Sequence, residues 1–369
     1  MEPNLPPQAG EPSRAPGPFM EPAAAPPPQR SLARGLLALV RRLLWVFVSG
    51  LLFVLALFFG GALALGMILG WAGPADMEGR PQERHFSHNS KAADKIAIIS
   101  VEGAILEGRG FVKRQIDRVR NDANVRAVVL RVDSPGGTVT GSDYLYHHLT
   151  ELARQKRIPI VVSMGSVAAS GGYYVAMAVG PRPDVIYAEP TTWTGSIGVM
   201  IPHYDASELL KKIGVRQDSV VVQPLKGMGT ITRPMTQEER DVLVALVKES
   251  LERFKKVVQS GRPKFQKDLK ALEEVATGQV FSAEQAARNG LVDKIGFVED
   301  AVDRAIELAG LTPDRVNVVE YRREFSLTGY LLDSRAKSPA IDVASLLDLT
   351  VPRAYYLYGW APSVVSSSE

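Results

Sequence analysis

A serine followed by two glycines closes an apolar run at residue 170. The run "IPIVVSMGSVAASGG" (158–172) predicts a buried strand that ends near Ser170, and the "YYVAMAV" after it predicts a helix. A serine on a strand-to-helix turn presents its hydroxyl for nucleophilic attack, and a helix N-terminus favours a developing oxyanion. Two interpretations stay open for Ser170: it is a nucleophile, or it belongs to a turn whose small residues only allow tight packing.

A second glycine-rich loop follows another predicted strand. The sequence "DSPGG" (133–137) ends the β-branched run over 125–133. Its backbone N–H groups and that of Gly171 are candidate donors to an oxyanion. Glycine-rich loops at the same ends of neighbouring parallel strands form a ligand cleft in α/β sheets. The alternative is an ordinary Pro-Gly-Gly turn.

The candidate nucleophile needs a base, and no histidine lies near a second chemical signal. The chain has no cysteine and five histidines, none of them in a metal-ligand spacing, so neither a thiol nucleophile nor a metal or other cofactor is expected. Lys226 stands just after a β-branched run, in "VVVQPLKGMGTITRP". A lysine acts as a base only where desolvation brings its pKa well below about 10.4. The alternative is an ordinary surface lysine.

The chain after residue 95 alternates between strand and helix patterns. This alternation predicts an α/β fold with a mostly parallel sheet in one domain over 95–325. The expected strands are 95–103, 125–133, 159–164, 184–190, 194–201 and 219–224, and the expected helices are 111–122, 142–156 and 236–261. Thr236 is the expected N-cap of the last helix, with Glu238 and Glu239 in its first turn.

The N-terminal part predicts a membrane anchor. Residues 1–42 are rich in Pro and Ala and are expected to form a disordered cytoplasmic tail. Residues 43–72 are apolar over more than the roughly 20 residues that span a bilayer, so a single transmembrane helix is expected. Arginines crowd its N-terminal flank, which places the catalytic part outside the cytoplasm. A cleavable signal peptide is the alternative, with a shorter apolar region. A linker is expected over 73–94.

Composition narrows the class of partner. The net charge is only +3 and no basic stripe with interleaved aromatic residues occurs, so a nucleic-acid partner is not expected. The C-terminal tail, 326–369, contains an aromatic cluster around Tyr355, Tyr356, Tyr358 and Trp360. We expect this cluster to cover the chain's own core and assign it no function.

Five motifs in order give a resemblance to a known family. They are "DSPGG", "VVSMGSVAASGGYYVAMA", "TGSIGV", "KGMGTITRPMTQEER" and "GQVFSAEQAARNGLVDKIG". Together they cover roughly 95–310, and the chain resembles the signal peptide peptidase A family of bacterial membrane-bound Ser-Lys proteases (peptidase family S49). The resemblance implies the Clp protease/crotonase-like superfold and a homo-oligomeric ring in which the serine and lysine of one active site can come from different protomers; the sequence leaves open whether they come from the same protomer here.

The resemblance also implies roles for individual residues. Ser170 matches the nucleophile, Lys226 the general base, and Ser196 the hydroxyl that orients the lysine. Gly137 and Gly171 match the oxyanion-hole positions. The family usually reads K-D-M-G-S-P around the lysine, where this chain has "KGMGTI".

The expected function is therefore a membrane-anchored serine endopeptidase that cleaves hydrophobic peptides such as signal-peptide remnants. Its expected location is the bacterial inner membrane, with membrane lipid as a neighbour, the N-terminus in the cytoplasm and the catalytic domain outside. Two alternatives remain: a crotonase-like acyl-CoA enzyme that uses the same oxyanion-hole geometry, and a catalytically silent membrane scaffold.

Overall fold

The computed structural model describes residues 42–50, 53, 81–323 and 354–357. The chain divides into two compact units, Met1–Trp71 and Ala72–Glu369. Residues 42–50 are helical, and within the described ranges no helix combines the length and apolar character needed to cross a membrane. The expected tail over 1–41, most of the expected anchor over 43–72 and most of the C-terminal tail lie outside the described residues.

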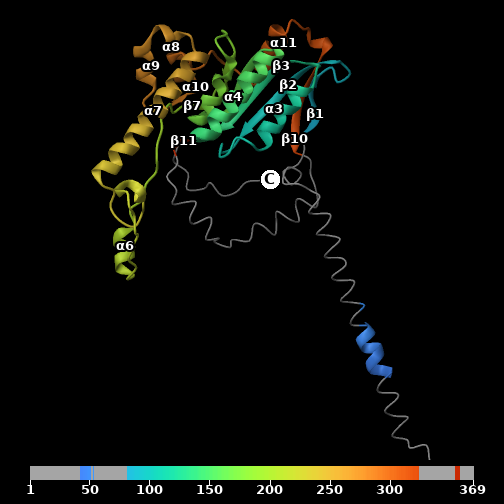
Figure 1. Ribbon diagram of the computed structural model, residues 1–369. Coiled ribbons are helices and arrows are strands. Elements are labelled where there is room, and N and C mark those ends of the chain that lie inside the picture. Colours follow the sequence, from blue (N-terminus) through green and yellow to red (C-terminus); the bar gives the residue numbers. More distant parts are fainter. Residues whose placement is uncertain (1–41, 51–52, 54–80, 324–353, 358–369) are drawn as a thin grey trace, which may run out of the picture. The chain divides into compact units, whose positions relative to one another are not determined.

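A nine-stranded, mostly parallel sheet organises the second unit as far as it is described (Figure 1). Its strands run in the order β1-β10-β2-β3-β5-β6-β9, while β7 pairs with β5 and β8. The expected parallel α/β sheet is confirmed. The strands are β1 (Pro81–His88), β2 (Asp94–Glu102), β3 (Val125–Ser134), β5 (Ile160–Ala169), β6 (Ile186–Ala188), β7 (Trp193–Gly195), β8 (Val280–Ser282), β9 (Lys294–Ile295) and β10 (Val316–Arg323), and a separate two-stranded sheet joins β4 (Gly136–Thr138) to β11 (Tyr355–Leu357).

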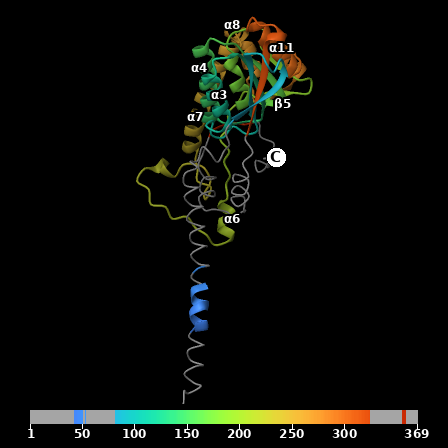
Figure 2. The ribbon, with the colours of Figure 1, turned by 90° about the vertical axis from the view of Figure 1, so that its right-hand side faces the viewer.

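Helices cover both faces of the sheet. α3 packs beside α4 on one face, and α11 packs on β2, β3, β5 and β6 from the other (Figures 1 and 2). Because both faces are covered, the central strands are buried along most of their length and read as continuous β-branched runs. The helices are α3 (Phe111–Asn121), α4 (Val139–Lys156), α5 (Gly171–Ala176), α6 (Ser207–Lys212), α7 (Gln237–Gly261), α8 (Lys264–Lys267), α9 (Leu269–Val275), α10 (Ala283–Asn289) and α11 (Val298–Leu308), with 3-10 turns η1 (Met177–Val179), η2 (Pro224–Gly227) and η3 (Pro313–Arg315).

The helix starts follow from their capping residues. Thr236 caps α7 as predicted: its hydroxyl accepts a hydrogen bond from the Glu239 N–H, and the Thr236 N–H in turn donates one to the Glu239 carboxylate. This reciprocal arrangement satisfies two N–H groups that the helix leaves unpaired. Thr138 caps α4 by accepting from the Gly141 N–H at 3.0 Å. α4 therefore begins directly after the glycine-rich loop over 133–137.

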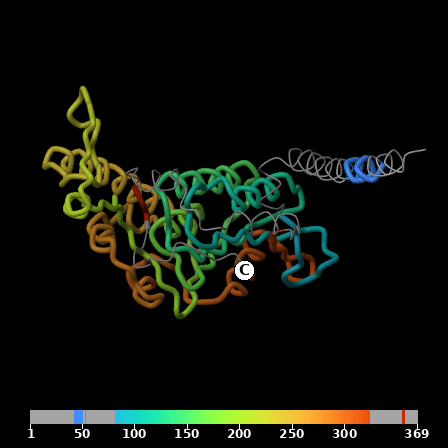
Figure 3. Tube along the Cα trace, turned by 90° about the horizontal axis from the view of Figure 1, so that it is seen from below, coloured from blue at the N-terminus to red at the C-terminus, as the bar shows by residue number. Residues whose placement is uncertain are grey.

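Four segments differ from the expectations. The strand expected over 194–201 is limited to β7, Trp193–Gly195. The expected linker over 73–94 contains β1, which pairs antiparallel with β10, so segments more than 200 positions apart lie side by side (Figure 3). The expected strand over 219–224 does not form: Val220 and Val222 are 98% and 90% exposed, and no strand among the described residues pairs with this run. The C-terminal tail contributes β11, which the sequence patterns did not predict.

Candidate active site

Ser170 lies at the junction between β5 and α5. It is the N-cap of α5 and is only 1% exposed. Its backbone has φ 53° and ψ −115°, a region that residues with a Cβ rarely occupy. Such strain costs about 1–3 kcal/mol and persists where the surrounding structure imposes it, most often at functional sites. The turn therefore fixes Ser170 in an unfavourable conformation, which tight packing alone does not require.

Ser196 lies beside Ser170 because their strands are paired. β7 runs parallel to β5 with Gly195 opposite Ala169, and the Ser170 N–H donates to the Gly195 carbonyl at 2.8 Å. Ser196 is 5% exposed and also has a positive φ, 52°. Its own N–H donates to the Gln279 carbonyl at 2.7 Å. The structure thus brings the two expected serines together at the carboxyl ends of adjacent strands, where α/β sheets form their sites.

The loop over 133–137 lies against the N-terminus of α5. A Cβ on Gly171 would lie 3.1 Å from the Gly137 nitrogen and 2.4 Å from the Ser142 Oγ. A Cβ on Gly136, whose φ is +100°, would lie 2.6 Å from the Gly171 nitrogen. Only glycine permits these approaches. The two expected oxyanion-hole positions, Gly137 and Gly171, are therefore close neighbours next to Ser170.

Polar contacts of Ser134 hold this loop. The Ser134 hydroxyl donates to the Gly103 carbonyl at 2.6 Å and accepts from the Gly136 N–H at 3.1 Å. On the other side, the Ile105 N–H donates to the Gly136 carbonyl, and the Thr138 N–H donates to the Ile105 carbonyl, each at 2.8 Å. The loop position is thus set by hydrogen bonds to the chain that follows β2.

The C-terminal strand β11 lies along this loop. β11 pairs antiparallel with β4, with Tyr356 opposite Gly137, and a Cβ on Gly136 would lie 2.1 Å from the Tyr356 carbonyl oxygen. On its other edge, Tyr355 exchanges two backbone hydrogen bonds with Met200, at 2.9 and 3.0 Å. The segment is therefore held by its backbone between two other segments, as an extended peptide is held by strand addition.

The side chain of Tyr356 is fully buried in an aromatic cluster. It stacks on Tyr174 with ring centroids 5.0 Å apart, contacts Phe254 at 4.6 Å, and donates its hydroxyl to the Ser250 carbonyl at 2.8 Å. Burial raises the pKa of Tyr356, and burial with a hydrogen bond to the Asp143 carboxylate raises the pKa of Tyr174. The expectation that the C-terminal aromatic residues cover the chain's own core is confirmed for Tyr356.

Lys226 forms no hydrogen bond with either of the two serines in the described part of the chain. It lies in η2, within the segment between Pro202 and Thr236, and its exposed side chain forms no hydrogen bond or ion pair with any described residue. The same segment exposes large apolar side chains over its length, including Tyr204 (77%), Ile213 (64%) and Val220 (98%). Within the described part of the chain, the site therefore contains both serines and both glycines but lacks the expected base.

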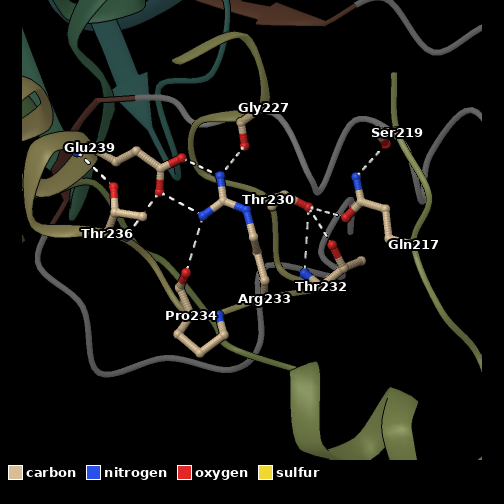
Figure 4. Close-up of polar contacts among 9 residues, drawn as sticks. All are labelled: Gln217, Ser219, Gly227, Thr230, Thr232, Arg233, Pro234, Thr236 and Glu239. Atoms are coloured by element: carbon tan, nitrogen blue, oxygen red, sulfur yellow. Dashed lines mark hydrogen bonds and ion pairs between the residues drawn. The ribbon is translucent and has the colours of Figure 1, made fainter. Parts of the chain in front are cut away.

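A charged pair holds the end of the Lys226-bearing segment (Figure 4). The Arg233 guanidinium binds both carboxylate oxygens of Glu239, with Nη1 3.0 Å from Oε2. Glu239 is 2% exposed, and Arg233 is 41% exposed at its side chain. The hydrogen bond from Arg233, together with that from the Thr236 N–H, lowers the pKa of Glu239 to about 2. Sequence reasoning named Glu239 as a first-turn acidic residue but missed its partner, because nothing in the spacing distinguishes Arg233 from a solvated arginine.

Comparison with known proteins identifies the family. The model of peptidase family S49 matches residues 152–312. A putative protease of Synechocystis sp. is 37% identical over 224 residues, which cover 61% of this chain and 78% of that protein. A putative signal peptide peptidase SppA of Enterococcus faecium is 35% identical over 242 residues, covering 62% and 67%.

A longer relative is similar over part of its length. Protease 4 of Haemophilus influenzae is 32% identical over 275 residues, which cover 70% of this chain, and the chain spans only 43% of that protein. The family-model match over 152–312 includes Ser170, Ser196 and Lys226. The chain belongs to peptidase family S49, the family of the SppA-type serine proteases.

Proposed function

We propose that this chain is a serine endopeptidase that works through a Ser-Lys dyad formed by Ser170 and Lys226. The observation that carries the proposal is the conformation of Ser170: a buried serine held at positive φ on the N-terminus of a helix. Ser196 lies beside it at the end of the paired strand β7, and Gly137 and Gly171 lie close to each other next to it. A turn that only packed small residues would place glycine at such a φ.

The reaction follows from the groups around Ser170. The Ser170 Oγ attacks the peptide carbonyl carbon while neutral Lys226 Nζ takes the hydroxyl proton. The carbonyl oxygen becomes an oxyanion, which the N–H groups of Gly137 and Gly171 and the α5 dipole stabilise. Lys226 then returns the proton to the leaving amine as the C–N bond breaks. A water molecule, deprotonated by Lys226, hydrolyses the acyl-enzyme ester, and Ser196 orients the lysine through its hydroxyl.

The base comes from a second copy of the chain in this proposal. Lys226 is exposed and without polar partners among the described residues, on a segment that also exposes large apolar side chains. Exposed apolar surface of this kind is typical of subunit interfaces. A homo-oligomer would bury these side chains and bring the Lys226 of one protomer to the Ser170 of its neighbour. Desolvation there would favour the neutral amine that a base requires.

The proposed substrate is an extended hydrophobic peptide. β4 already accepts an extended backbone, since β11 pairs with it beside Ser170. A substrate that replaced β11 would place its backbone along the same glycines and an apolar side chain near Tyr174 and Phe254. We further propose that residues 43–72 anchor the chain in the bacterial inner membrane with the protease unit outside the cytoplasm, and that its substrates include signal-peptide remnants.

Mixing of inactive variants tests the dyad. Ser170→Ala and Lys226→Ala are each expected to lower cleavage of a hydrophobic fluorogenic peptide by about 10³-fold or more, since a nucleophile and its base act as a unit. Lys212→Ala, an exposed lysine in α6 of the same segment, is the matched control and should behave like the parent. A mixture of the two inactive variants should recover activity if the site is shared between protomers.

The alternative outcomes are distinct. Full activity of Lys226→Ala would refute the dyad. Inactive single variants without recovery in the mixture would refute the shared site while leaving the dyad intact. Turnover of an acyl-CoA without peptide cleavage would support a crotonase-like enzyme, and a parent chain whose Ser170 fails to react with a fluorophosphonate would support a scaffold.

A further inference from the structure

The segment that carries Lys226 has little hydrophobic support of its own. Along 215–228 no described side chain is fully buried, and the short 3-10 turn η2 is its only regular structure. A base must nevertheless be held within a fraction of an ångström, since a displacement of about 1 Å lowers rates by about 10²-fold. Something outside η2 must therefore position the lysine.

Contacts of Arg233 supply such a support (Figure 4). Besides its two bonds to Glu239, the guanidinium donates to the Pro234 carbonyl at 3.1 Å and to the Gly227 carbonyl at 3.5 Å. Gly227 directly follows Lys226, and a Cβ built on it would lie 4.0 Å from the Arg233 Nη2, the nearest described atom outside residues 226–228. The guanidinium therefore lies against the backbone that carries the lysine.

Glu239, the carboxylate partner of Arg233, is firmly fixed in the fold. Glu239 is 2% exposed and completes the capping box at the start of α7. α7 runs for 25 residues and is anchored by buried side chains near its C-terminal end, among them Phe254, Val257 and Val258. The connection thus passes from the protease unit through α7 and Glu239 to Arg233 and the carbonyl next to Lys226.

We propose that Arg233 is a positioning residue for the base: its guanidinium joins the buried Glu239 carboxylate to the Gly227 carbonyl and so fixes where Lys226 presents its amine. This inference rests on the proposed function, because it assigns Arg233 a role in catalysis through Lys226. The geometry requires arginine, since its planar fork reaches both carboxylate oxygens and a carbonyl at once, whereas lysine offers a single charged centre.

The principal test is the kinetics of Arg233→Ala, with Arg240→Ala as a control of equal charge. Arg240 is exposed on α7 next to Glu239 and has no polar partner among the described residues. Arg233→Ala should lower kcat for peptide cleavage about 10- to 100-fold, with KM within twofold of the parent. Arg240→Ala should leave both unchanged. Guanidinium ion at millimolar concentration should restore part of the kcat of Arg233→Ala and do nothing for Arg240→Ala.

Epistasis separates a role through Lys226 from general support of the fold. In a Lys226→Ala background, whose residual activity no longer depends on the amine, Arg233→Ala should have no further effect on kcat. A loss of kcat by the same factor in the parent and Lys226→Ala backgrounds would overturn the inference, as would an Arg233→Ala variant with the parent's kcat. Should Arg233→Ala fail to fold, Arg233→Lys decides the question: a loss of about tenfold in kcat at unchanged KM supports the inference, and parental kcat overturns it.

Failure of the proposed function has a different signature. If Lys226→Ala alone retains full activity, the dyad is wrong whatever Arg233 does. If Lys226→Ala is inactive and Arg233→Ala has the parent's kcat and pH profile, only the positioning role of Arg233 is refuted.

Discussion

The backbone strain at Ser170 predicts that removing the side chain altogether will stabilise the protein. Ser170 has φ 53° and ψ −115°, and its hydroxyl forms no hydrogen bond with any described residue. Ser170→Ala keeps the Cβ and therefore the strain. Ser170→Gly removes both the nucleophile and the strain, because glycine adopts positive φ about as readily as negative φ. Both variants lack the hydroxyl and are equally inactive, so the difference between their free energies of unfolding reports the backbone strain at residue 170.

The expected difference in stability between Ser170→Gly and Ser170→Ala results from two opposing contributions. Relief of a rare backbone conformation is worth about 1–3 kcal/mol. Glycine loses more conformational freedom on folding, which offsets about 0.5–1 kcal/mol of that gain. Ser170→Gly should therefore be more stable than Ser170→Ala by about 1 kcal/mol. For a unit of this size, such a difference raises Tm by about 2–4 °C.

Thermal unfolding of the purified full-length variants measures this difference. Both should fail to react with a fluorophosphonate, and the parent should unfold close to Ser170→Ala. A Ser170→Gly variant that unfolds at or below the temperature of Ser170→Ala would refute the reasoning, because the turn would then impose no conformational strain on residue 170.

Three further predictions concern the surroundings of the site. Gly137→Ala should abolish peptide cleavage and lower Tm, since its Cβ would lie 1.9 Å from a backbone oxygen, whereas Gly227→Ala meets nothing closer than 4.0 Å and should be stable. Glu239 has its folded pKa at about 2, below the ordinary 4.5, so its stabilisation is complete above about pH 5 and is lost as pH falls toward 2. At 1.36 kcal/mol per pKa unit, the lowered pKa of Glu239 corresponds to about 3 kcal/mol of stability, which screening at the 41% exposed Arg233 reduces to about 1–2 kcal/mol. Urea titrations of Glu239→Gln and parent should differ by that amount at pH 7 and converge near pH 2. Tyr356→Phe removes one buried hydrogen bond and should lower stability by about 1 kcal/mol in the same assay, with no change at all contradicting the docking of β11.

The strand ends were predictable from sequence because local patterns determine them. The run before Ser170 and the loop over 133–137 both close buried β-branched strands, and parallel pairing brings such ends together. That Ser196 would lie beside Ser170 came only from the family resemblance; its reason is the register of β7 on β5. Register over so short a strand leaves little signal in a single sequence.

Other features escaped prediction for physical reasons. The run over 219–224 has the composition of a strand, but β propensity reflects packing against neighbours, and this run has none among the described residues. β11 is three residues long and pairs with β4 across more than 200 positions, so its partner leaves no local pattern. The Arg233–Glu239 pair likewise depends on a fold-back that charge spacing alone does not specify.

The hydrogen bonds of the glycine-rich loop provide a way to observe the site without substrate. The Ile105 N–H donates to the Gly136 carbonyl, and the Thr138 N–H donates to the Ile105 carbonyl. Neither amide takes part in the proposed reaction. Their exchange with solvent deuterium therefore reports how often this loop opens. The protection of these two amides gives the free energy of opening of the loop over 133–137 in the intact protein.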